Sequence, residues 1–137
     1  MTKIFLDTNI LIYAVDSRDP VKQDKAIDLL HRCMRDGSGV ISTQVVQEYA
    51  SVAIGKLHQN VNVVIAEVAL LESLEVVQLT PALIRRGLEL HARHGVHFWD
   101  ALILAAAELA RCTRLWSEDF SPGSIYGMLR VENPLAA

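Results

Sequence analysis

The stretch IFLDTN, residues 4–9, places an aspartate directly after three apolar residues, and the next six residues, ILIYAV at 10–15, are almost all apolar. A continuous apolar run is typical of a strand covered on both faces in a parallel sheet. Thr8 or Asn9 can cap a helix that begins directly after this strand. Because an unpaired buried carboxylate is costly, we expect Asp7 to reach solvent, cap the helix or hold a cation.

The rest of the chain alternates short apolar segments with longer segments of helical periodicity. The expected strands are residues 3–7, 39–42, 75–79, 114–117 and 127–131. The expected helices are residues 10–15, 20–36, 44–58, 60–74, 81–94 and 98–112. Strands that alternate with helices indicate βαβ units, so the sequence predicts an α/β fold with a mostly parallel sheet of four to five strands.

Size and composition favour one compact protein domain, residues 1–137, in which 51% of the residues are hydrophobic. The formal net charge of −3 argues against a general nucleic-acid binder, but not against an enzyme that contacts nucleic acid locally. Cys33 and Cys112 form no CxxC pair, so we expect buried thiols in a reducing compartment. With no signal-peptide pattern and no apolar run of membrane length, a cytoplasmic protein that binds no membrane is expected.

Four acidic residues fall at one predicted edge of the sheet: Asp7, Glu48, Asp100 and Asp119. Asp7 and Asp119 follow strands at their carboxyl ends, where open parallel sheets bind ligands. The helices that carry Glu48 and Asp100 begin at the same edge if the connections are right-handed. Each acid also has a simpler explanation. Glu48 can reach solvent from the edge of an apolar stripe, Asp100 can interact with a helix dipole, and Asp119 can form an Asx turn.

Taken together, the four carboxylates would repel one another strongly. Two carboxylates ~5 Å apart cost about 3 kcal/mol at an effective dielectric constant of about 20. Such a cluster persists only if the carboxylates share protons or bind a cation. A ligand set of oxygen atoms without Cys or His favours Mg²⁺ or Mn²⁺. The sequence therefore predicts that Asp7 interrupts the apolar run because it holds such a metal ion.

Four segments follow one another in a particular order: IFLDTNILIYA at 4–14, ISTQVVQEYASV at 41–52, FWDALILAAA at 98–107 and LWSEDFSPG at 115–123. In this order and spacing they resemble the PIN-domain nucleases, most closely the VapC-type toxins of toxin–antitoxin pairs. The terminal residues 129–134 also resemble the closing segment of that family. The resemblance covers essentially the whole chain and implies a three-layer α/β/α PIN-like fold.

The resemblance also implies an activity, the metal-dependent endonucleolytic hydrolysis of RNA phosphodiester bonds that leaves a 5′-phosphate and a 3′-hydroxyl. The four acidic positions of the family fall on Asp7, Glu48, Asp100 and Asp119. One or two Mg²⁺ or Mn²⁺ ions would be held by Asp7, Asp100 and Asp119. Glu48 would complete the cluster directly or through water.

The neighbouring polar positions of the family fall on Thr8, Asn9 and Ser117. The hydroxyl groups of Thr8 and Ser117 would orient carboxylates or water. Family members often have Thr-Asn-Asp where this chain has Ser117-Glu118-Asp119. Glu118 is therefore an additional acid, and the sequence leaves open whether Asp119 or Glu118 is the fourth ligand.

The resemblance implies an RNA substrate and a cognate antitoxin, and the apolar helices at 20–36 and 44–74 favour a protein interface such as a homodimer. Three other interpretations remain. A phosphatase of the haloacid-dehalogenase type would need a second acid where Asn9 stands. A non-catalytic, partner-binding PIN-like module would gain nothing from four mutually repelling acids. An RNA-processing nuclease without an antitoxin would use the same residues and the same chemistry.

Overall fold

The computed structural model describes residues 2–136, and these residues form a central six-stranded sheet in the order β3-β2-β1-β4-β6-β5. The strands are β1 (Ile4–Leu6), β2 (Gly39–Ser42), β3 (Glu75–Val77), β4 (Arg114–Trp116), β5 (Ile125–Tyr126) and β6 (Leu129–Glu132). Neighbouring strands are parallel, except for the antiparallel pair of β5 and β6. The predicted α/β fold with a mostly parallel sheet is therefore confirmed.

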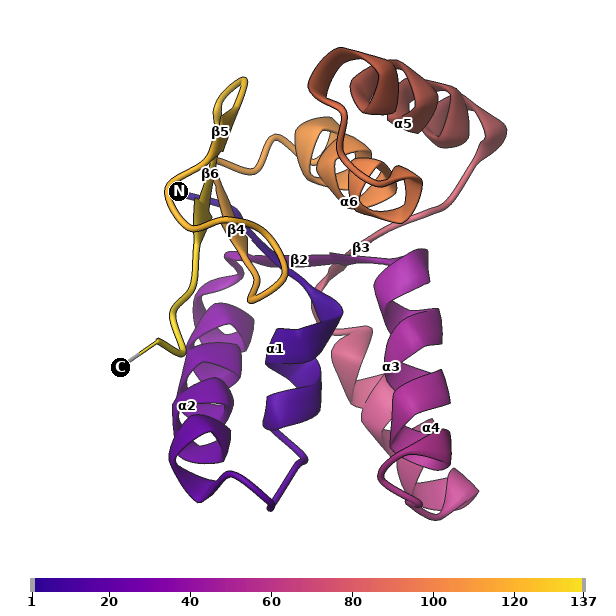
Figure 1. Ribbon diagram of the computed structural model, residues 1–137. Coiled ribbons are helices and arrows are strands. Elements are labelled where there is room, and N and C mark those ends of the chain that lie inside the picture. Colours follow the sequence, from indigo (N-terminus) through magenta and orange to yellow (C-terminus); the bar gives the residue numbers. More distant parts are fainter. Residues whose placement is uncertain (1, 137) are drawn as a thin grey trace.

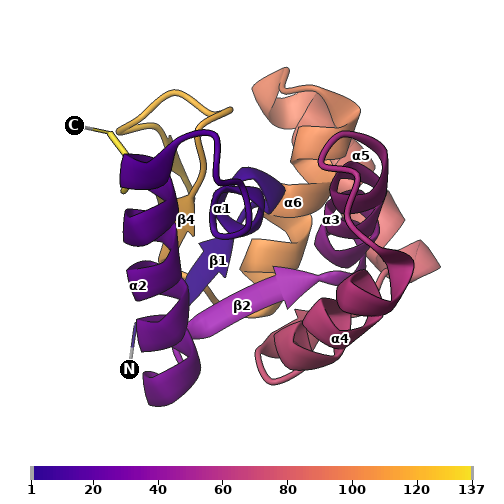
Figure 2. The ribbon, with the colours of Figure 1, turned by 90° about the horizontal axis from the view of Figure 1, so that it is seen from below.

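Helices cover both faces of this sheet. They are α1 (Thr8–Tyr13), α2 (Pro20–Asp36), α3 (Thr43–Gly55), α4 (Val61–Leu71), α5 (Pro81–His94) and α6 (Phe98–Leu109). Helices α5 and α6 lie on one side of the sheet, and α1 to α4 lie on the other (Figure 1). Seen from below, α1 follows the tip of β1, with α2 on one side and α3 on the other (Figure 2). The three-layer arrangement expected from the sequence is present.

The observed elements differ from the expected ones mainly at their ends. The sheet has one strand more than the upper expectation, because β5 is only two residues long and gives no periodic signal. The helices expected to reach residues 58, 74 and 112 end at Gly55, Leu71 and Leu109. Two residues beyond these ends, His58 and Arg111, have positive φ angles of 52° and 62°, which regular helix geometry does not allow.

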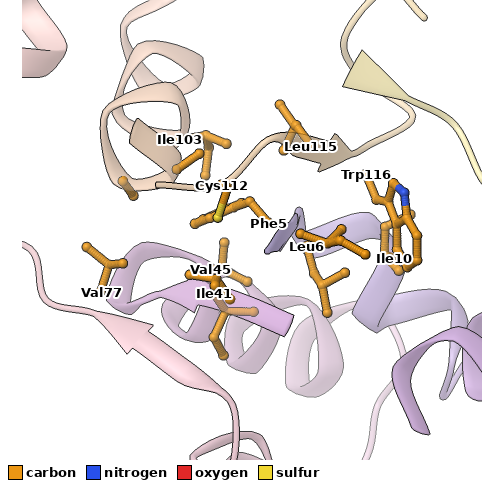
Figure 3. Packing of buried hydrophobic residues seen from close by; sticks show 14 of the residues in the cluster. Phe5, Leu6, Ile10, Ile41, Val45, Val77, Ile103, Cys112, Leu115 and Trp116 are labelled. Atoms are coloured by element: carbon orange, nitrogen blue, oxygen red, sulfur yellow. The ribbon is translucent and has the colours of Figure 1, made fainter. Parts of the chain in front are cut away.

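The hydrophobic core surrounds the two central strands of the sheet. Phe5, Leu6 and Leu115 are fully enclosed and pack among side chains from both helical layers, including Ile103 and Val45 (Figure 3). Full burial of each such side chain stabilises the fold by about 1.5–3 kcal/mol. The carboxyl ends of β1 and β4 are therefore anchored firmly, and side chains that follow them have little freedom to move.

Two expectations about composition can be compared with this core. Cys33 and Cys112 are both buried and form no disulfide, as the sequence predicts. Among residues 2–136, no helix is both long enough and apolar enough to cross a membrane.

Gly39 begins β2 at a position where the surrounding atoms leave no room for a methyl group. A Cβ atom built on Gly39 would lie 2.7 Å from Leu74 Cδ2 and 2.9 Å from Cys33 Cβ. The Cβ of Cys33 is fixed to the backbone and cannot rotate away. We expect Gly39→Ala to lower the free energy of unfolding by about 1–3 kcal/mol, measured by urea denaturation.

Gly55, at the end of α3, provides the matched control. A Cβ atom there would meet no atom within 4 Å, and alanine is the better helix former. Gly55→Ala should leave stability unchanged or raise it by up to about 1 kcal/mol. Equal effects of the two substitutions would contradict the packing argument for Gly39.

Candidate active site

Asp7 lies where β1 ends and α1 begins, at the carboxyl end of a central strand, and is only 5% exposed. Its Oδ1 accepts the backbone N–H of Thr8 at 2.8 Å, and its Oδ2 accepts the Ser117 hydroxyl at 2.7 Å. Asp7 is thus the N-cap of α1, which is one of the three roles expected for it, whereas Thr8 and Asn9, the other expected caps, lie within the helix. Both carboxylate oxygens are held, although neither faces a basic side chain.

Glu48 on α3 is fixed from two directions. The hydroxyl of Thr8 donates to Glu48 Oε2 at 2.8 Å, and the Gln44 side-chain amide donates to Glu48 Oε1 at 3.1 Å. The same amide nitrogen lies 3.2 Å from the carbonyl oxygen of Trp99, which ties α3 to the first turn of α6. Gln44 was not among the site residues predicted from the sequence. Its position four residues before Glu48, on the same helix face, was the available signal.

The loop that follows β4 brings Asp119 to the same edge of the sheet. The amide nitrogen of Asn9 donates to Asp119 Oδ2 at 3.2 Å, and Asn9 Oδ1 accepts the backbone N–H of Glu118 at 3.3 Å. The backbone N–H of Asp119 donates to Ser117 Oγ at 3.0 Å. Ser117 therefore links Asp119 to Asp7, since its own hydroxyl donates to the Asp7 carboxylate.

Among the described residues, Glu118 forms an ion pair, unlike its neighbour Asp119. Its Oε2 lies 2.7 Å from the ammonium group of Lys22 on α2, and this pair is partly buried. The charge of Glu118 is therefore balanced within the protein, whereas the Asp119 carboxylate accepts a hydrogen bond from a neutral amide.

The environment of Asp7 makes its ionisation unfavourable. The pKa of Asp7 is raised from its usual 3.8 to about 6, and burial is the largest cause. The hydrogen bonds from Ser117 and Thr8 lower this pKa, and the charges of Asp119 and Glu48 add to the increase. A carboxylate at this position is thus costly for the protein to keep ionised at neutral pH.

Asp100, in the first turn of α6, belongs to the same electrostatic cluster. The pKa of Asp100 is raised, and burial is the largest cause. The charges of Asp119 and Glu48 also raise this pKa, whereas the charge of His97 lowers it. Within residues 2–136, none of the four acids forms an ion pair with a basic side chain. The charges of Glu48 and Asp119 thus act on both Asp7 and Asp100, which groups the four acids around one edge of the sheet.

The chemistry of these donors suits a hard divalent cation, because all of them are negatively charged oxygen ligands. In the described part of the chain, however, no three His, Cys, Asp or Glu side chains lie close enough together to hold a metal ion. Mg²⁺ commonly binds proteins through one or two carboxylates and completes its coordination with water and substrate phosphate. These residues thus provide the type of ligand that such an ion prefers, but they do not surround it on all sides.

The protein is thus an α/β protein with acidic side chains at the carboxyl edge of a mostly parallel sheet. The model of the PIN domain matches residues 4–121, which is most of the chain. The protein belongs to the PIN domain family.

Solved structures with the same fold support this placement. A toxin–antitoxin complex from Klebsiella pneumoniae has 24% identity and a TM-score of 0.70, with 97% of this chain and 98% of that one covered. DNA-bound VapBC from Salmonella typhimurium has 20% identity and a TM-score of 0.67, with 98% and 99% covered. Mycobacterium tuberculosis VapC20, a toxin that cleaves the sarcin-ricin loop, has 19% identity and a TM-score of 0.66, with 85% and 92% covered. No curated protein matches the sequence.

The raised pKa of Asp7 makes stability depend on pH. Because this pKa is about 6 in the folded protein and 3.8 in an ordinary setting, the folded state holds the proton more tightly. The stabilising contribution of protonated Asp7 is complete below about pH 4 and is lost as the pH rises through about 6, a change of about 3 kcal/mol. Asp7→Asn should therefore exceed wild type in stability by up to about 3 kcal/mol near neutral pH, and by little near pH 4.

This comparison uses denaturant unfolding in EDTA at both pH values. Asparagine retains the size of the side chain and is a good N-cap, so α1 should be preserved. A variant that is less stable than wild type at neutral pH would show that the buried charge is compensated in the folded protein.

Proposed function

We propose that this protein is a Mg²⁺- or Mn²⁺-dependent endoribonuclease and the toxin of a toxin–antitoxin pair. The observation that carries the proposal is the cluster of Asp7, Glu48, Asp100 and Asp119 at one edge, where none of them forms an ion pair with a basic side chain of residues 2–136. Keeping this charge costs stability, and such costs are typical of sites retained for function. A module that only binds partners would have no use for it.

In this proposal Asp7, Asp100 and Asp119 hold the cation, and Glu48 completes the cluster directly or through water. The bound ion would supply positive charge against the scissile phosphate and make an attacking water more acidic. The carboxylates of Asp7, Glu48 and Asp119 keep their charge because the groups that hold them are neutral donors. Ser117 fixes one oxygen of Asp7 at 2.7 Å, so this carboxylate keeps one orientation.

Other polar groups position Glu48 and Asp119. Thr8 and Gln44 each occupy one oxygen of Glu48, at 2.8 Å and 3.1 Å, so this side chain has one preferred orientation. Asn9 holds Asp119 at 3.2 Å. These groups leave the negative charge intact, whereas a lysine or arginine in their place would compete with the cation.

Asp119, rather than Glu118, is the fourth acid of the proposed site. Its charge acts on both Asp7 and Asp100, raising the pKa of each. Glu118 instead forms an ion pair with Lys22 on α2 at 2.7 Å, so its charge is balanced within the protein.

The proposed substrate and partners rest on similarity to other proteins. The related VapC20 is described as cleaving the sarcin-ricin loop, and the related Klebsiella chain was solved in a toxin–antitoxin complex. We extend to this chain an RNA substrate, a cognate antitoxin and a cytoplasmic location. Apolar side chains of α4 that remain exposed, among them Val61, Val63 and Ile65, support the expected homodimer.

The first test is cleavage of a mixed pool of tRNA and rRNA by purified, partner-free protein in Mg²⁺, Mn²⁺ or EDTA. Wild type should give discrete fragments only with metal. Asp7→Asn should lower the rate at least about 100-fold, because it removes a charged ligand whose supporting groups alone are usually worth 10–100-fold. Cleavage in EDTA, or full activity of Asp7→Asn, would refute the proposed metal site.

Adjacent acids allow a matched comparison in the loop after β4. Asp119→Asn and Glu118→Gln each remove one negative charge while preserving side-chain size. We expect the loss from Asp119→Asn to exceed that from Glu118→Gln by at least about 10-fold in cleavage rate, with circular dichroism confirming that both are folded. The reverse order would assign the fourth position to Glu118.

A further inference from the structure

A second feature lies outside the proposed cleavage site, in a pocket of about 370 Å³ between α5, α6 and the β5–β6 hairpin. We call it the α6-end pocket, because it begins at Leu104 and continues past the end of the helix to Arg111. In Figure 1 the hairpin rises beside α6 on the side of the sheet that carries α5. The volume is within the range of small-ligand sites, about 300–1,000 Å³.

Arg111 occupies a backbone position that favours glycine. It follows α6 in the left-handed conformation, with φ 62°, and its N–H donates to Glu108 O at 3.0 Å. Two other helices end in the same conformation at glycine residues, Gly37 and Gly95. A residue with a Cβ atom is disfavoured there, so the chain carries the arginine side chain against the preference of its own backbone.

The rim of the pocket is positively charged, although the chain as a whole has a net charge of −3. Arg86, Arg93 and Arg111 line it together with a single acid, Glu108. Glu108 is already paired with Arg86, at 2.9 Å and 3.0 Å. Within residues 2–136, Arg93 and Arg111 form no ion pair, and both are exposed. Two guanidinium groups are therefore free for an anion.

The inner wall is apolar and aromatic. Tyr126 stands edge-on to His94, with ring centroids 5.1 Å apart and planes at 84°. The ring of Tyr126 also lies 6.2 Å, between centroids, from that of Phe120, the residue that directly follows Asp119. The pocket is thus joined through packed rings to the loop that carries one of the proposed catalytic acids.

We propose that the α6-end pocket binds a nucleotide of the RNA substrate away from the cleaved bond, with phosphate at Arg93 and Arg111 and the base against Tyr126. Guanidinium groups pair well with phosphate, and unstacked bases pack on aromatic side chains. This inference rests on the proposed RNA substrate. Asp100 and Leu109 lie about 14 Å apart along α6, and Arg111 lies just beyond the end of this helix, so the bound nucleotide is separate from the cleaved bond.

The test is binding of a fluorescein-labelled single-stranded RNA of mixed sequence, about 20 nucleotides long, followed by anisotropy in EDTA at several salt concentrations. Arg111→Gly removes the side chain and suits the backbone, so its melting temperature should equal or exceed that of wild type. We expect it to bind RNA about 10-fold more weakly. The slope of log affinity against log salt should fall by about 0.7, the value for one lost phosphate contact. Arg93→Gln should act similarly.

Arg35→Gln, on α2 and on the other side of the sheet, controls for a general loss of positive charge and should change the affinity less. The proposal is overturned if Arg111→Gly binds RNA with the affinity and salt slope of wild type, or if wild type binds no RNA. It is also overturned if Arg111→Gly binds a labelled poly-glutamate peptide more weakly than wild type does but binds RNA equally well. The pocket would then be a site for an acidic peptide. Failure of the proposed nuclease function would appear separately, as no metal-dependent cleavage by wild type.

Discussion

The hydrogen bond from the Ser117 hydroxyl to the Asp7 carboxylate depends on the pairing of the two central strands. Leu6 of β1 is in register with Trp116 of β4, so the next residue of each strand, Asp7 and Ser117, lies at the same edge. A slip of one residue would exchange the faces of the strand and separate the two groups. The enclosed side chains of β1 prevent such a slip, and in this way the core determines the geometry of the acidic edge.

The carboxylates of this protein fall into two groups, which differ in the side chains that contact them. Asp16, Glu108 and Glu118 pair with arginine or lysine, and their charges are balanced inside the fold. Of the four acids at the sheet edge, Asp7, Glu48 and Asp119 instead accept hydrogen bonds from hydroxyl, amide or backbone N–H groups. Neutral donors restrict orientation but do not cancel charge. The combination is unfavourable for stability and suitable for attracting a cation, which is the basis of the proposed function.

Much of this arrangement could be predicted from sequence because it depends on local patterns. The apolar run before Asp7 predicts β1, and strand-then-helix alternation places the four acids at one edge. The contact of Gln44 with the carbonyl of Trp99 could not be predicted in the same way, because the two residues are 55 positions apart. The choice between Asp119 and Glu118 likewise depends on Lys22, 96 residues away. Contacts between distant segments leave no periodic signal in the chain.

Helix α6 connects the proposed cleavage site with the α6-end pocket. Asp100 stands in its first turn and Arg111 just beyond its last, and the helix dipole favours a negative charge at the former position and a positive charge at the latter. Between them, residues 101–107 are all buried, so the helix cannot bend or slide without disturbing the core. The two sites are therefore held at a fixed separation. In the proposed function, an RNA that contacts both sites must match this separation, and selection by shape would then be compatible with the negative net charge of the protein.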